Sequence, residues 1–126
     1  MLIPDDKIPV RLPVKWYFSD DISSIIIIEY KKNFSKLESF LSKLLRSPTS
    51  IKRTLDVMNS RLWFLMDGEN SFSDIINMME SEFKEEIMPS KQRITTSIMN
   101  LIELRLVTLL TKSEEIYWET EPFKNS

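Results

Sequence analysis

Paired carboxylates are the residues of this chain best able to do chemistry on their own. Two such pairs, Glu85-Glu86 and Glu114-Glu115, could hold a divalent cation, but no loop has the ligand spacing of a calcium site. The chain has no histidine and no cysteine, which removes the usual metal ligands, the usual general base and the common nucleophilic arrangements. We therefore expect solvated surface charge, with no catalytic residue, no metal site and no cofactor.

Charge is divided unevenly along the chain. Residues 1–60 hold ten Lys and Arg against seven Asp and Glu, a net charge of +3, whereas residues 61–126 hold seven against twelve, a net charge of −5. An acidic half is a poor footprint for nonspecific nucleic-acid binding. The start of the chain has no signal-peptide pattern, and the longest aliphatic run, Ile25 to Ile28, is too short to span a bilayer. We expect one cytoplasmic domain without membrane partners.

The elements that must position any site begin with extended segments. Residues 1–13 carry three prolines and predict an extended lead-in to the domain. Aromatic and β-branched residues predict strands over 14–19 and 24–30, joined as a hairpin by an aspartate turn. An amphipathic pattern predicts a helix over 34–46, and strict alternation of apolar and polar residues predicts a third strand over 50–57.

Three helical patterns follow the third strand. The first helix begins after Asp56 and stops before Gly68, the only glycine of the chain, because glycine takes left-handed geometry past a helix end without steric cost. Ser71 begins a second helix with capping-box spacing to Asp74, and Pro89 opens a third. The apolar stripes that predict one shared core are Leu62, Leu65 and Met66, then Phe72, Ile75, Ile76 and Met79, then Ile94, Ile98 and Leu101.

The C-terminal part completes the predicted fold. Residues 107–119 predict two short strands around a polar turn, and residues 121–126 a loose tail. The whole order predicts an α+β winged helix-turn-helix over residues 14–120. It has an N-terminal β-hairpin plus a third strand, an extra helix before that strand, three core helices and a C-terminal β-hairpin. Within the first core helix, we expect Trp63 to be buried and Phe64 to point away from the apolar face.

One ordered pattern runs through residues 50–110. It consists of Leu55-Asp56, Ser60, Trp63, Asp67-Gly68, Ser71, Asp74 and Ile75, continued by Phe83, Arg93, Leu101 and Leu106-Val107. In order and spacing this pattern resembles the PqqD-like family, named for the D protein of pyrroloquinoline quinone biosynthesis and including the RiPP recognition elements. Arg105 stands where the family usually has a glycine, so either a left-handed arginine or a different corner is expected there.

The resemblance implies a non-catalytic peptide-binding module. Similar proteins bind the leader segment of a ribosomally made precursor peptide as an added strand and present it to a modifying enzyme, often a radical SAM enzyme. The implied groove lies between the third strand and the third helix. Its expected peptide-binding residues are Ile51, Lys52, Arg53, Thr54, Leu55, Lys91, Thr95 and Met99. Lys52, Arg53 and Arg61 would form a basic patch that receives an acidic leader, or would protect an edge strand from aggregation.

Two other functions stay open, as does the oligomeric state. A winged-helix DNA-binding regulator would use the exposed face of the third helix, where residue types that read base edges gather. These residues are Lys91, Gln92, Thr95, Thr96 and Asn100. The acidic C-terminal half argues against this function, because phosphate contacts dominate such binding. The remaining possibility is an interaction subunit without a peptide client.

Overall fold

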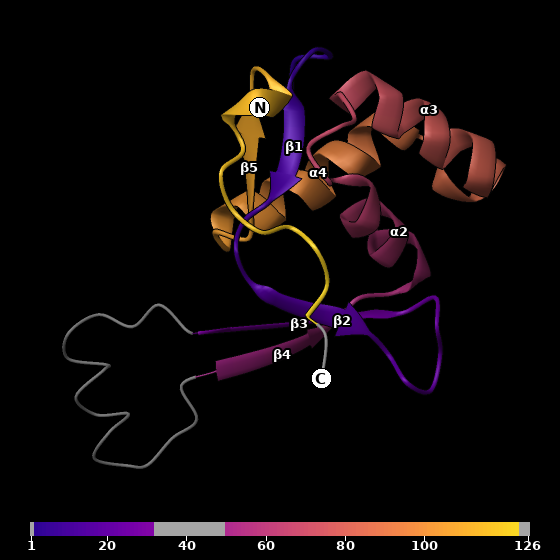
Figure 1. Ribbon diagram of the computed structural model, residues 1–126. Helices are drawn as coiled ribbons and strands as arrows, with labels where there is room; N and C mark the ends of the chain where they lie inside the picture. The colour runs from indigo at the N-terminus through magenta and orange to yellow at the C-terminus, as the bar shows by residue number, and fades with distance from the viewer. Residues whose placement is uncertain (1, 32–49, 124–126) are drawn as a thin grey trace.

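The described part of the chain has an α+β architecture. The computed structural model describes residues 2–31 and 50–123, in which three α-helices pack beside two antiparallel sheets (Figure 1). The elements are β1 Ile8–Arg11, β2 Lys15–Phe18, β3 Ile26–Lys31, β4 Ser50–Thr54, α2 Val57–Leu65, α3 Phe72–Phe83, the 3-10 turn η1 Lys84–Ile87, α4 Ser90–Glu103, β5 Val107–Leu110 and the 3-10 turn η2 Ser113–Glu115. The helix expected over 34–46 lies outside the described residues. None of the described helices is long and apolar enough to cross a membrane.

The larger sheet contains the three strands expected from the N-terminal half. β2 and β3 form the predicted hairpin, and β4 pairs with the other side of β3, so the strand order is β2-β3-β4. Its inner face buries Trp16, Ile26 and Ile28, each at most 1% exposed. Trp16 meets Trp63 of α2 edge-on, with ring centroids 6.2 Å apart. Aromatic packing of this kind joins the sheet to the helices.

Side-chain caps define the corner between α2 and α3. Asp56 accepts a hydrogen bond from the backbone N–H of Asn59 at 2.7 Å and caps the start of α2. Ser71 and Asp74 form a reciprocal capping box at the start of α3. Between the two helices, Gly68 has a φ of +90°. The caps and the left-handed glycine predicted from the sequence are therefore confirmed.

Gly68 is required for space as well as for backbone geometry. A Cβ atom at this position would lie 2.0 Å from Cδ1 of Ile116 and 3.3 Å from Cγ2 of Val10. The end of the Ile116 side chain can move, but the left-handed backbone strain would remain. The corner is thus a place where β1, the α2–α3 turn and the C-terminal segment meet.

We expect Gly68→Ala to destabilise the fold by about 1–3 kcal/mol, because backbone strain adds to the displacement of Ile116. Urea denaturation measures the free energy of unfolding. Ile116→Ala removes the side chain that a Cβ at position 68 would strike. The double variant should therefore lose less stability than the sum of the losses in the two single variants. A Gly68→Ala variant as stable as the wild type would contradict a strained corner.

The third predicted helix, α4, packs its apolar stripe into the core. Ile94, Ile98 and Leu101 are buried, as expected. After the helix, Arg105 has a φ of +62°, and the backbone N–H of Leu106 donates to the carbonyl oxygen of Leu101 at 2.9 Å. The corner is therefore left-handed without a glycine, at a strain of about 1 kcal/mol.

The hairpin predicted over residues 107–119 is wrong. Only β5 forms there in the described part of the chain, and its partner is β1, with Val10 opposite Thr108. Residues 1–13, expected as a lead-in, thus contain a strand with fully buried Val10. Alternation along a segment indicates a strand but does not identify its partner, and here tertiary packing brings the two ends of the chain together.

Arg11 joins these ends inside the core. It is 3% exposed, and its guanidinium donates to the carbonyl oxygens of Trp63, Phe64 and Thr120 at 2.8, 2.8 and 3.0 Å. The first two carbonyls lie at the C-terminus of α2, where the backbone dipoles leave partial negative charge. The guanidinium also lies 4.7 Å from the ring centroid of Trp16. Desolvation lowers the pKa of Arg11 to about 10, so the side chain stays charged at neutral pH.

The C-terminal segment returns to the edge of β2. Thr120 also accepts a hydrogen bond from the indole N–H of Trp16 at 3.0 Å, and the backbone N–H of Phe123 donates to the carbonyl oxygen of Trp16 at 2.7 Å. The indole N–H of Trp118 donates to the carbonyl oxygen of Arg11 at 2.6 Å. Residues 121–123, expected as part of a loose tail, are therefore held against the domain.

We expect Arg11→Met to lower the free energy of unfolding by about 1–3 kcal/mol, because the carbonyl oxygen of Phe64 loses its donor and those of Trp63 and Thr120 each keep only one. Arg11→Lys should recover little, since an ammonium cannot reproduce the planar fork. Thermal and urea denaturation report the loss, and Arg105→Met, which removes an exposed arginine, is the matched control. If Arg11→Met unfolded at the same urea concentration as the control, the buried guanidinium would not hold the fold together.

Candidate functional site at the β4 edge

β4 presents the open edge of the larger sheet. Among the described strands it has a hydrogen-bonded neighbour on one side only, which is β3. The opposite edge, at β2, receives the hydrogen bond from Phe123. An unpaired strand edge is a template for an added strand. β4, the strand expected to bind a peptide, is thus the edge strand that the described C-terminal segment does not cover.

The register of β4 defines which backbone groups face outward. The backbone N–H of Leu55 donates to a carbonyl oxygen of β3 at 2.9 Å. Hydrogen-bonded pairs alternate along an antiparallel ladder, so Ile51 and Arg53 also bond to β3. Lys52 and Thr54 must then direct their N–H and C=O groups away from β3. These two residues supply the donors and acceptors that an added strand requires.

The side chains of β4 divide between the two faces of the sheet. Ile51 and Arg53 lie opposite Tyr30 and Ile28 on the inner face, and Arg53 donates to the hydroxyl oxygen of Tyr30 at 3.2 Å. Ile51 is half-buried and Arg53 exposed, so the inner face is open to solvent at this edge. Leu55 is buried in the core and is not available to a ligand, contrary to expectation.

Two shallow clefts identify the flank of α4 that faces the sheet. Arg93 and Ser97 line a cleft of about 50 Å³ together with residues of α2 and with Asp56, the N-cap of α2 that follows β4. Leu104 lines a second cleft with Tyr30 of β3. Residues three or four apart on a helix share one side. The sheet-facing flank of α4 therefore consists of Arg93, Ser97 and Asn100, and Leu104 continues it at the C-cap of the helix.

The helix residues expected in the groove lie on the other flank. Lys91, Thr95 and Met99 follow one another at intervals of four, on the far side of the buried stripe. Lys91 Nζ is 3.2 Å from a carboxylate oxygen of Asp5, and Met99 packs partly into the core. The structure does not bring these three residues to β4. The sequence shows which stripe of α4 is buried, but the flank that meets the strand depends on how the helix packs on the sheet.

The expected basic patch is also divided. Lys52 lies on the outer face of the sheet and Arg53 on the inner face, while Arg61 is on α2, with its Nε 3.3 Å from a carboxylate oxygen of Glu82. Alternation along a strand puts neighbouring residues on opposite faces. Of the three, only Arg53 lies on the side of the sheet that faces α4.

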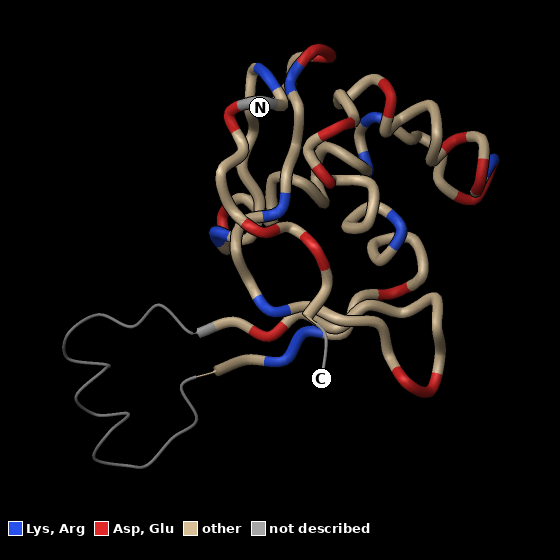
Figure 2. Tube along the Cα trace, viewed as in Figure 1, with Lys and Arg blue, Asp and Glu red and all other residues tan. Residues whose placement is uncertain are grey.

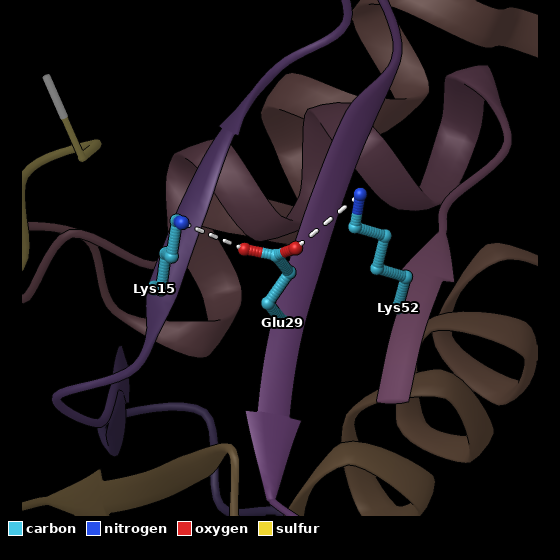
Figure 3. Close-up of polar contacts among 3 residues, drawn as sticks. All are labelled: Lys15, Glu29 and Lys52. Carbon is cyan, nitrogen blue, oxygen red and sulfur yellow. Dashed lines mark ion pairs between the residues drawn. The ribbon is translucent and has the colours of Figure 1, made fainter. Parts of the chain in front are cut away.

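An ion-pair chain crosses the outer face of the sheet. Glu29 on the central strand lies between Lys15 of β2 and Lys52 of β4, with N–O distances of 2.9 and 3.5 Å (Figure 3). The hydrogen bond from Lys15, followed by the charges of both lysines, lowers the pKa of Glu29. One carboxylate thus links side chains from all three strands.

The lowered pKa gives the ion-pair chain a defined pH dependence. Its stabilisation should be complete above the ordinary carboxyl pKa of about 4.3 and should be lost as the pH falls through the lower pKa of the folded state. We expect Glu29→Gln to be less stable than the wild type at neutral pH, with the difference shrinking at acidic pH and in high salt. Urea denaturation across pH measures it. A difference that stays constant down to the acid limit would exclude this role.

Within the described residues, no group of three or more acidic side chains could hold a metal ion. No protein-family model, no curated protein and no solved structure matches the chain.

Proposed function

We propose that the chain is a non-catalytic peptide-binding domain of the PqqD-like, winged helix-turn-helix type. It captures an extended segment of a ribosomally made precursor peptide on β4 and presents that peptide to a modifying enzyme. The observation that carries the proposal is the outward direction of the backbone groups of Lys52 and Thr54. Each such residue can exchange a pair of hydrogen bonds with an antiparallel strand.

Side chains around the edge favour an acidic peptide. An added strand would direct alternate side chains toward Arg53 and the sheet-facing flank of α4, where Arg93 supplies a second positive charge. Neither arginine forms an ion pair within the described residues. Backbone pairing would provide affinity, and these charges would select the register of the peptide. The proposed ligand is still the acidic leader expected from the sequence. The helix residues proposed to contact it are now those of the sheet-facing flank of α4, in place of Lys91, Thr95 and Met99.

The expected partner enzyme is a radical SAM enzyme, on the family resemblance alone. Such an enzyme would supply the chemistry, which suits a chain without histidine or cysteine. We do not propose DNA binding, since β5 pairs with β1 instead of forming a local hairpin wing, and acidic Glu115 follows β5 in η2.

The direct test is titration of the isotope-labelled protein with short peptides encoded beside its gene. We expect amide shifts in residues 51–54 and in the sheet-facing flank of α4. Thr54→Pro deletes an outward donor and should weaken binding by about 1–3 kcal/mol, roughly fivefold to 150-fold in Kd. Arg53→Ala should cost about 1 kcal/mol or less.

Two variants serve as controls for this titration. Thr54→Val keeps the backbone donor and should bind as the wild type does, and Lys91→Ala alters only the far flank of α4. Perturbations confined to β5 and the C-terminal segment would exclude β4 as the site. If none of the local peptides binds, an interaction subunit without a peptide client becomes the better description.

A further inference from the structure

A second surface lies between the β2–β3 turn and the helices α2 and α3. It is a pocket of about 550 Å³ that contains no residue of β4. Its apolar lining consists of Phe18, Ile26, Val57, Phe64 and Phe83. This volume is in the range of pockets that enclose large ligand groups. The pocket is therefore separate from the site proposed above and does not depend on it.

The pocket wall contains large apolar side chains that are partly exposed to solvent. Phe18 is 41% exposed, Val57 48% and Phe64 42%. The rings of Phe18 and Phe64 lie 6.1 Å apart, and the guanidinium of Arg61 lies 5.6 Å from the centroid of Phe64. Phe64 is the aromatic residue that points away from the core stripe of α2. Clustered exposed aromatic residues mark interaction surfaces, whereas single ones do not.

The polar groups of the pocket do not form a catalytic site. Ser60 is fully used, because its hydroxyl accepts from the backbone N–H of Ile26 at 2.8 Å and donates to the carbonyl oxygen of Leu55 at 3.2 Å. Arg61 is paired with Glu82. The pocket is thus an apolar concavity whose polar groups serve the fold.

Acidic residues lie on two sides of this apolar concavity. Its lining comes from the end of β2, the β2–β3 turn, the start of β3, α2 and the end of α3. Asp20 and Asp21 lie in the β2–β3 turn, next to the lining residues Ser23 and Ser24, and Glu82 lines the pocket from α3. The one basic residue among the described residues that line it is Arg61. Figure 2 shows the acidic segments at the β2–β3 turn and at the end of α3. Such a rim attracts cations and repels anionic lipid surfaces and nucleic acids.

We propose that this pocket docks a cationic amphipathic segment of a partner protein. A large aliphatic or aromatic side chain of that segment enters between Phe18 and Phe64, and flanking Lys and Arg residues meet the acidic rim. The apolar anchor provides most of the affinity, and the charges select the partner and speed the encounter.

The test uses two amidated amphipathic helical peptides that share the same leucine and tryptophan face. One has lysine at every polar position and the other has glutamate. We expect the lysine peptide to bind, with amide shifts centred on residues 18–24 and 57–64, and the glutamate peptide to bind at least tenfold more weakly. Asp20→Asn combined with Asp21→Asn, or raised salt, should weaken the lysine peptide severalfold.

Substitution of the anchor pocket separates docking from nonspecific adhesion. Phe64→Ser should reduce affinity at least tenfold with little change in thermal stability, because this side chain is largely outside the core. Tyr117→Ser removes an exposed aromatic ring elsewhere and should have no effect. Equal binding of both peptides, shifts centred on residues 51–54, or no binding would overturn the proposal. Self-association abolished by Phe64→Ser would overturn it in favour of contacts between copies.

Discussion

The fold depends on one buried cation. Arg11 leaves water on folding, which is unfavourable for a charge unless acceptors replace the lost solvent. Two carbonyl groups at the end of α2, one carbonyl from the C-terminal segment and the face of Trp16 supply that replacement. The same side chain belongs to β1, so a single guanidinium ties the first strand, the first helix after β4 and the last described residues into one core.

The hydrogen bond from Arg11 to Thr120 lies close to the edge of the larger sheet that is covered. Arg11 donates to the carbonyl oxygen of Thr120. Three residues later the C-terminal segment reaches β2, where the backbone N–H of Phe123 donates to the outward carbonyl oxygen of Trp16. The other edge strand keeps its outward groups at Lys52 and Thr54. Glu29 on the central strand pairs with a lysine of each edge strand on the outer face. The described contacts thus cover the β2 edge and leave the outward groups of β4 without a partner among the described residues.

The sequence predicts those features of the fold that depend on residues close together in the chain. Asp56, Gly68 and Ser71 define helix ends through local backbone chemistry, and their predicted roles are confirmed. The pairing of β1 with β5 joins opposite ends of the chain, and no local pattern specifies it. The separation of Lys52 from Arg61, and the choice of the α4 flank that meets the sheet, likewise depend on packing that a linear pattern does not contain.

Two surfaces with opposite electrostatic character result from this arrangement. Arg53 and Arg93 lie near the β4 edge, whereas Asp20, Asp21 and Glu82 lie beside the pocket between Phe18 and Phe64. A domain with both could hold an acidic peptide at one surface and a basic partner at the other. Holding the peptide and the partner on one domain would raise the effective concentration of the partner near the peptide, and this requires no catalytic group in the domain.

Amide hydrogen exchange of the free protein shows whether the edge of β4 is open. An open edge predicts slow exchange for the amides of Ile51 and Arg53, which bond to β3, and fast exchange for those of Lys52 and Thr54. Equal protection of all four amides would show that the edge is already occupied, and would contradict strand addition there.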